Sequence, residues 1–524
     1  GILEVDDVIL GVEKMRFNED ARKQFARAVM QAEREGSKGM LRLIRWRAGK
    51  TKQVELKIPV LGTYSSTAPY HCRKSARIFE RGCESIARRG LDKVSIPNSI
   101  NALALLASGR PEYRTLLSDY ANKVANYRVG AFATWHYGYA IMFLAEYAMA
   151  TKDPSVMPGL ERLALESARG QSLVGTWGHR FAMPDGRVGG YGCMNSPGIP
   201  LAISMVLARE AGVHNPDLNI AITRSAGFLR WYVNKGAIPY GDHIPWPGHE
   251  DNGKCSMAAI LFDLLGDREA ATFFTRMSMA AYDERERGHT GNFFNILWAM
   301  PAVARCGPQS TGAYWREQAW YYDLARGWGG SFRYQGAPVG EEEHDKYTHW
   351  DNTGTYLLTY ALPMKSLYIT GKKPFAVQTL TASESEEVIT AGRDYFSTRS
   401  GLSGREMDRY RYEHRSKKEL LAGLSSWSPA VRKRSARELG RRDGDVMPIL
   451  LNLLKSSNLD SRYGAVEALG SLTSKMNEAA RVSVLSNALQ ADDLWLRILA
   501  AEALAGIGDP AKIAIPDMLK RFAM

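Results

Sequence analysis

The first sixty residues alternate between apolar and polar positions in three short stretches. Residues 2–12 have the pattern of a strand, and residues 40–60 contain two more such runs, MLRLIRW and QVELKIPV, around a turn at Gly49. Between these stretches, residues 21–29 place their apolar side chains on one face of a helix, which Asn18 can cap. The pattern predicts a strand, a helix and a β-hairpin.

From about Ser99 to Thr370 the apolar positions follow the helical period, and no strand alternation competes with it. Helices such as HYGYAIMFLAEYAMAT contain many small residues, and turns rich in glycine and aromatic residues separate them. Pro154 and Gly170 mark two of the helix ends. This region is predicted to be a succession of helical hairpins.

The C-terminal region repeats a helical motif about every 30 to 35 residues, and Leu439, Leu469 and Leu504 close its successive copies. Such a period is typical of stacked helix pairs. A charged stretch separates this region from the hairpins. We therefore expect five parts, which are a small N-terminal domain (1–62), a linker (63–98), a helical domain (99–370), a second linker (371–415) and a C-terminal solenoid (416–524).

The N-terminal part resembles the second half of a PDZ domain, in which an L-x-x-G-D-x-I-L strand is followed by a groove helix and closing strands. Residues 3–10, LEVDDVIL, match that strand except that Asp6 replaces the glycine. The carboxylate-binding loop of the family would lie upstream of the matched segment. Because half a PDZ domain has little core, we expect the natural chain to extend beyond Gly1, where any signal peptide would also lie.

The helical part resembles the α/α toroid of terpenoid cyclases and protein prenyltransferases, an architecture that polysaccharide lyases and glycosidases also use. Residues 171–177, QSLVGTW, match the Q-x(2–5)-G-x-W motif of terpene cyclases, and residues 236–241 and 326–332 occupy comparable turns. The D-x-D-D acid of class II cyclases and the zinc ligands of prenyltransferases have no counterpart here. We therefore expect neither of those reactions, and we predict no metal ligand.

The C-terminal part resembles HEAT repeats, with the A-x-x-A-L-G motif at residues 465–470. This resemblance implies a short arc whose concave face binds a protein partner. The predicted fold class is mainly α, namely an α/α toroid with a small α+β PDZ-like piece and a HEAT-like α-solenoid. The combination resembles uncharacterised bacterial multidomain proteins that are often exported to the periplasm or secreted.

Composition adds a preference for anionic partners. The 524 residues are 45% hydrophobic and 24% charged, which is typical of several globular domains, and no apolar run approaches the ~20 residues of a membrane span. The net charge of +12 favours an acidic polysaccharide, a nucleic acid or an anionic membrane surface. Nucleic acid is disfavoured, because no aromatic residues interleave the basic cluster at 432–442. The five cysteines lack a C-x-x-C pair and are expected to be buried thiols.

Eight of the ten histidines lie in the helical part, most of them in the glycine and aromatic turns. In a toroid these turns would gather around one cavity, where histidine exchanges protons and aromatic rings stack on sugars. The toroid lyases imply a Tyr and a His for proton transfer and Asn, His or Arg for the uronate carboxylate. By residue type and placement, the candidates are His136, Tyr137, His179, Arg180, Tyr191 and Asn195.

Residues 245–254, PWPGHEDNGK, carry the densest polar chemistry of the chain. We predict His249, Glu250 and Asp251 as acid–base residues that are also able to hold a cation, with Trp246 and Asn252 as substrate contacts. The alternative is a loop that caps the following helix.

Two further pairs of residues also contain a histidine that precedes a predicted helix. His289 with Asn292, and His349 with Trp350, are predicted to line the same cavity. Alternatively, these residues satisfy the amide groups at helix starts. A metal site from His344, Asp345 and His349 is a further alternative that no known ligand spacing supports.

Two functions remain open. The first is a lyase or hydrolase acting on a glycan or other polymer in the cavity, with an unknown cofactor requirement. The second is a non-catalytic interaction scaffold that uses the PDZ-like and HEAT-like modules. Convergence of the histidines on one cavity would favour the enzyme, and scattered histidines would favour the scaffold.

Overall fold

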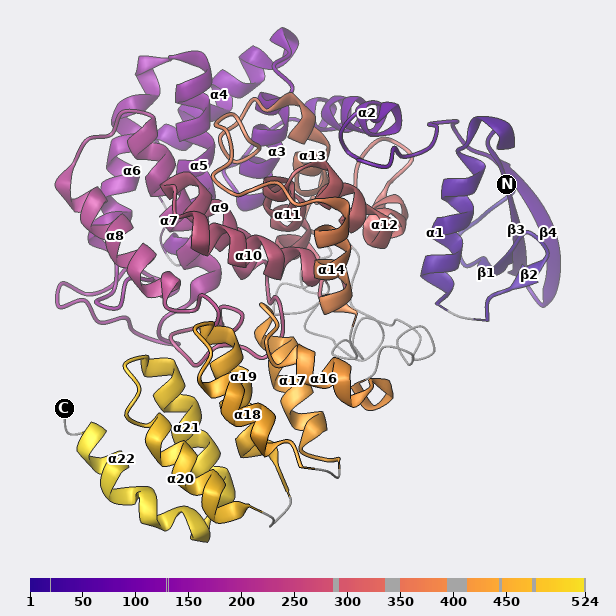
Figure 1. The fold of residues 1–524 in the computed structure, drawn as a ribbon. Helices are drawn as coiled ribbons and strands as arrows, with labels where there is room; N and C mark the ends of the chain where they lie inside the picture. Colours follow the sequence, from indigo (N-terminus) through magenta and orange to yellow (C-terminus); the bar gives the residue numbers. More distant parts are fainter. Residues whose placement is uncertain are drawn as a thin grey trace.

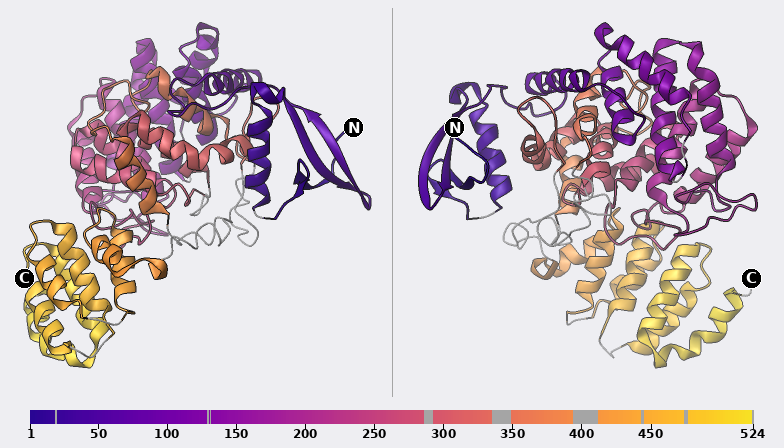
Figure 2. Two further views of the ribbon diagram at one scale, coloured as in Figure 1. Left: turned by 45° about the vertical axis from the view of Figure 1, so that its right-hand side comes forward. Right: turned by 180° about the vertical axis from the view of Figure 1, so that it is seen from behind.

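The computed structural model contains a small sheet, a large helical body and a layered C-terminal set of helices (Figure 1). Two further views show that the sheet and the C-terminal helices lie on separate sides of the body (Figure 2). The structure describes residues 1–18, 20–128, 130, 132–285, 292–334, 349–393, 412–442, 445–473 and 477–522. The expected fold class, mainly α with a small N-terminal sheet and stacked C-terminal helices, is confirmed.

The N-terminal module is an antiparallel sheet covered by one helix. Its elements are β1 (Val8–Val12), β2 (Met15–Arg16), α1 (Ala21–Ala32), β3 (Met40–Arg47) and β4 (Lys50–Lys57), with sheet order β2-β1-β3-β4. Leu41 and Leu43 of β3 are buried beneath α1. The predicted strand, helix and hairpin are thus present, but the strand begins at Val8 rather than at residue 2. The helix cap differs, because Asp20 rather than Asn18 accepts the first-turn amides.

Six buried helices form a closed ring in the body. They are α3 (Ile96–Ala107), α5 (Ala133–Thr151), α7 (Asn195–Glu210), α9 (Lys254–Leu265), α11 (Asn292–Val303) and α13 (Thr353–Ala361). Each contacts the next in this order, and α13 contacts α3. Every residue of α11 and α13 is buried, as expected for helices with neighbours on all sides. The closed ring is consistent with the toroid expected from the sequence.

An outer layer packs around the ring. Its helices are α2 (Arg73–Arg89), α4 (Arg114–Ala125), α6 (Met157–Arg169), α8 (Pro216–Arg230), α10 (Arg268–Ala280), α12 (Pro308–Ala325) and α14 (Ala382–Gly392). The stretch 63–98, expected to be a linker, contains α2, which buries Ile78, Phe79 and Ile86 and packs against α13. The stretch 371–415, also expected to be a linker, contains α14, which packs against α10 and α12.

The turns that lead from an outer helix to the next inner helix repeat one feature. An isolated antiparallel bridge closes three of them, joining Trp177 to Met194, Ala237 to Trp246 and Arg326 to Phe332. In the first turn, Gln171 Nε2 donates to Ala221 O at 2.9 Å and to Ser225 Oγ at 3.0 Å. The Q-G-W segment therefore ties its turn to α8.

The C-terminal helices stack in two layers. They are α16 (Lys417–Gly423), α17 (Pro429–Leu439), α18 (Met447–Leu454), α19 (Leu459–Ser471), α20 (Glu478–Ala488), α21 (Leu494–Ile507) and α22 (Ile515–Phe522). The helices α17, α19 and α21 contact one another in sequence, and Ser428, Asn458 and Asp493 cap them in equivalent positions. These contacts confirm the predicted stack of helix pairs.

Two further sequence expectations concern the whole chain. All five cysteines are buried and free. In the described part of the chain, none of the helices is long and apolar enough to cross a bilayer.

Candidate functional site

Aromatic side chains fill the centre of the ring. The helices α5 and α11 stand three places apart in the ring of six, so they face each other across its axis. Phe294 of α11 stacks on Trp135 and on Tyr139 of α5, with ring centroids 5.7 Å apart in each pair. Trp298 Nε1 donates to Tyr139 Oη at 3.2 Å, and Tyr139, Phe294 and Trp298 are each at most 1% exposed. Where these side chains contact one another, the axis of the ring is a packed core.

A second group of aromatic side chains, which shares Trp135 and Phe294 with the first, lies at the ends of the inner helices where these helices begin. We name Phe132, Trp135, His179, Phe294 and Trp350 the mouth cluster. His179 Nδ1 accepts a hydrogen bond from Trp135 Nε1 at 3.0 Å, and the Phe132 ring meets the His179 ring edge-on at 4.7 Å. Trp350 meets Phe294 at 6.3 Å. Phe132 is 51% exposed, so the cluster reaches the surface.

His136 and Tyr137 contact the outer layer. Tyr137 Oη donates to Glu166 Oε2 of α6 at 2.8 Å, and burial together with this carboxylate raises the pKa of Tyr137. The His136 ring lies 6.3 Å from that of Tyr127, and burial lowers the pKa of His136. The described residues offer no hydrogen-bond partner to His136 Nδ1. Tyr137 therefore lies between α5 and α6, and His136 lies beside Tyr127 in the loop that follows α4.

His249 lies where the ring meets the solenoid. Its Nε2 is 2.8 Å from Ser428 Oγ, the N-cap of α17, and its Nδ1 is 3.6 Å from Glu284 Oε1. The order of carboxylate, imidazole and hydroxyl matches that of a catalytic triad. However, His249 is 1% and Ser428 0% exposed, and Ser428 Oγ already accepts from Val431 N. The geometry is that of a buried joint between two modules.

Glu250 binds the start of α9. Its carboxylate accepts hydrogen bonds from Cys255 N at 2.8 Å, from Ser256 N at 2.7 Å and from Ser256 Oγ at 2.8 Å. Burial raises the pKa of Glu250 to about 7. Asp251 pairs with the fully buried Lys254 at 3.0 Å. These contacts agree with the alternative that the loop caps the following helix. A catalytic role of Glu250 and Asp251 stays a prediction.

Buried asparagines at the helix starts join neighbouring hairpins. Asn195 Nδ2 donates to Pro239 O at 3.0 Å and Gly241 O at 2.8 Å, and Asn292 Nδ2 donates to Tyr321 Oη at 2.7 Å. Asn295, which the sequence reasoning missed, accepts from Gly253 N at 2.6 Å. Its place in the first turn of a buried helix is a signal for such a structural role.

The remaining candidates are dispersed. Asn252 is fully buried in a left-handed turn (φ 54°), and Trp246 is half-buried beside its bridge to Ala237. Arg180, Tyr191 and His349 are exposed, and Tyr191 meets the Tyr240 ring edge-on at 5.8 Å. His289, His344 and Asp345 lie outside the described residues.

Comparison with known families accounts for most of the chain. A family model described as a domain of unknown function, DUF6288, matches residues 75–371, which is more than half of the 524 residues. The chain belongs to the DUF6288 family. A model of HEAT repeats matches residues 418–505, and this match confirms the HEAT repeats expected from the sequence. A search of curated proteins and a search of solved structures each gave no match.

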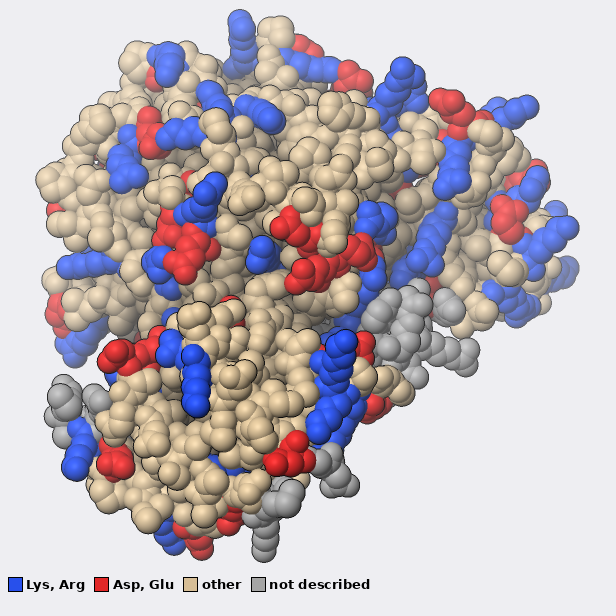
Figure 3. All heavy atoms as spheres, viewed as in Figure 1, with Lys and Arg blue, Asp and Glu red and all other residues tan. Residues whose placement is uncertain are grey.

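The DUF6288 match begins in α2 and ends after α13, so it spans the closed ring. Three of the described histidines of this region lie in different places: His136 is beside Tyr127, His179 is in the mouth cluster and His249 is against Ser428 of the solenoid. Among the described residues, no group of three or more His, Cys, Asp or Glu side chains is placed to hold a metal ion. Lys and Arg are interspersed with Asp and Glu on the visible face (Figure 3).

Proposed function

We propose that this DUF6288 protein is a non-catalytic binding scaffold. The observation that carries the proposal is the aromatic packing of Trp135, Tyr139, Phe294 and Trp298, which occupies the axis where an enzyme of this architecture would hold its substrate. His249 and Glu250, the first choices for catalysis, are engaged in buried contacts. HEAT solenoids present extended surfaces that suit protein partners.

We further propose an architecture for each of the three modules. The ring of six buried helices with an outer layer supports an α/α toroid similar to that of terpenoid cyclases. The order of strand, helix and hairpin supports a PDZ-like N-terminal module, which we place at residues 1–62. We assign α2 and α14 to the helical body, since α2 packs against α13 and α14 packs against α10 and α12, and we assign residues 416–524 to the solenoid.

A glycan ligand of the mouth cluster is the second candidate. One observation favours it, namely that Phe132 exposes half of its surface beside His179, which gives an aromatic face on which a sugar ring can stack. Arg180 is exposed next to His179 and offers a charge to an acidic sugar. In the catalytic form of this candidate, His179 transfers a proton to or from the polymer.

A panel of neutral and acidic polysaccharides separates the two candidates. Affinity electrophoresis measures binding, and the release of reducing ends or unsaturated uronate measures turnover. The scaffold predicts no turnover with any polymer. Turnover that is lost in His179→Ala but kept in the exposed control Trp328→Ala would overturn the scaffold and establish the enzyme. Binding without turnover that is lost in Phe132→Ala would assign a glycan to the mouth cluster.

A further inference from the structure

A basic cleft lies where the N-terminal module meets the ring. Its volume is about 520 Å³, and it is lined by the turn after α1, by the chain that leads to α2 and by the first turns of α2. The charged residues and the histidine of its lining are Arg34, Glu35, His71, Arg73, Lys74 and Arg77. This volume lies within the range of cavities that bind small molecules.

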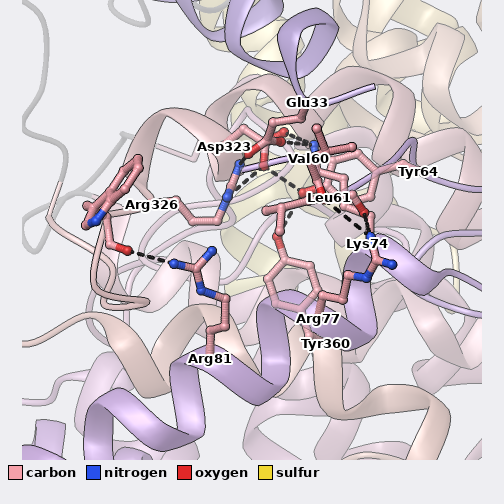
Figure 4. A network of polar contacts seen from close by, with 11 residues as sticks. Glu33, Val60, Leu61, Tyr64, Lys74, Arg77, Arg81, Asp323, Arg326 and Tyr360 are labelled. Carbon is pink, nitrogen blue, oxygen red and sulfur yellow. Dashed lines mark hydrogen bonds and ion pairs between the residues drawn. The ribbon is translucent and has the colours of Figure 1, made fainter. Parts of the chain in front are cut away.

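One wall of the cleft is fixed by a buried network of charges (Figure 4). Lys74 Nζ lies 2.7 Å from Glu33 Oε2 and 2.6 Å from Asp323 Oδ2. Arg326 pairs with the same two carboxylates at 2.6 Å and 3.0 Å. Because two cations meet two anions with little solvent contact, the network neutralises itself and holds α1 against α12.

The other cations of the cleft lack such counter-charges. Arg34 and Arg73 are exposed, and in the described part of the chain neither has an ion pair or a side-chain hydrogen bond. Arg77 uses Nη1 to donate to Leu61 O at 3.2 Å and to Val60 O at 3.4 Å, so it contacts carbonyls and no carboxylate (Figure 4). Among the described residues that line the cleft, Glu35 is the one acidic residue. Three arginines and one glutamate outside the buried network thus line the same cleft.

The backbone adds to this electropositive surface. Cys72 stands at the N-cap of the 17-residue helix α2, and its side chain accepts no hydrogen bond from the first turn. The amide groups there therefore add partial positive charge to the guanidinium groups. One guanidinium group can bind two oxygens of the same phosphate or carboxylate, and it binds these charged acceptors more strongly than neutral ones.

We propose that this cleft binds a small multivalent oxyanion, a phosphorylated or polycarboxylate metabolite, through Arg34, Arg73 and Arg77. Three guanidinium groups match a ligand with at least two negative charges, and the volume suits a small molecule. The site is separate from the mouth cluster and from the solenoid. Its occupancy would place a metabolite at the junction of the N-terminal module and the ring.

Isothermal titration of the full chain with inorganic pyrophosphate and with citrate tests the proposal. We expect binding of at least one probe, weakened about tenfold or more in Arg73→Gln and in Arg34→Gln. Both side chains are exposed, so both variants are expected to keep the wild-type thermal midpoint. Arg224→Gln, an exposed arginine on α8, is the matched control and is expected to bind as the wild type does.

The two probes distinguish the ligand classes. Preference for pyrophosphate assigns a phosphorylated ligand, and preference for citrate assigns a polycarboxylate. The proposal is overturned if neither probe binds at millimolar concentration. It is equally overturned if Arg34→Gln and Arg73→Gln bind as tightly as Arg224→Gln, because the binding would then reflect overall charge.

Discussion

The buried network between α1, α2 and α12 gives the sharpest stability prediction. Lys74→Met keeps most of the side-chain volume but leaves Glu33 and Asp323 with Arg326 as their one remaining cation. Lys74 is 1% exposed, so the unpaired negative charge stays buried. Removing one partner of a buried ion pair costs about 3–5 kcal/mol. We expect a loss of that size in the free energy of unfolding, measured by urea denaturation.

An exposed ion pair of similar length is the matched control. Arg316 Nη2 lies 2.7 Å from Glu386 Oε2, but the two side chains are 61% and 42% exposed. Arg316→Met is therefore expected to cost less than about 1 kcal/mol. The double variant Lys74→Met/Glu33→Gln restores charge balance, and we expect it to recover part of the loss. If Lys74→Met costs no more than Arg316→Met, the argument from burial fails.

The same network has a pH dependence. Burial alone would raise the pKa of Asp323, but Arg326 and Lys74 outweigh burial and lower it below its ordinary value. A carboxylate with a lowered folded pKa stabilises the protein above its unfolded pKa, and this stabilisation disappears as the pH falls through the folded pKa. We expect protonation of Asp323 in acid to lower the free energy of unfolding by more in the wild type than in Lys74→Met.

Three further predictions concern the ring and its joint with the solenoid. The pKa of Glu250 is raised to about 7, so the folded state binds the proton more tightly than the unfolded state does. This residue therefore makes the free energy of unfolding fall as the pH rises from about 4.5 to 7. Glu250→Gln should remove that part of the pH dependence, measured by urea denaturation at several pH values, and an unchanged pH dependence would contradict the assignment. His249→Ala should cost about 1–3 kcal/mol and increase protease cleavage between ring and solenoid, whereas an unchanged thermal midpoint would contradict the joint. Trp298→Ala should cost about 3–5 kcal/mol by opening a cavity on the axis, and a cost below about 1 kcal/mol would show that the axis is not packed.

Local patterns were sufficient to predict most elements. The alternation in residues 40–60 and the turn at Gly49 correspond to β3 and β4, and the equivalent leucines of the C-terminal repeats are buried. Closure of the ring could not be predicted this way, because the contact of α3 with α13 joins segments about 250 residues apart in sequence, and periodicity carries no information on such pairs. The helix α2 was missed because its many arginines obscure the apolar face formed by Ile78, Phe79 and Ile86.

The candidate site was harder to predict because one sequence feature has two physical causes. A polar side chain before an apolar helix satisfies the amide groups of that helix whether or not it also meets a substrate. Glu250 accepts from amide groups of its helix, and Asn195 instead donates to carbonyl groups of a neighbouring turn. The partner of His249 is Ser428, 179 residues away, so no local pattern could reveal the joint.

The exposed fraction of a side chain distinguishes a ligand-binding role from a structural role, whereas its residue type does not. A side chain that must meet a ligand has to keep an accessible face, whereas one that serves the fold is enclosed by its partners. Phe132 combines an accessible face with a contact to His179 at the end of the packed axis. Arg34 and Arg73 are exposed and line the basic cleft. Ligand searches are therefore better directed at these two surfaces than at the polar loop around His249, because the solenoid already covers that histidine.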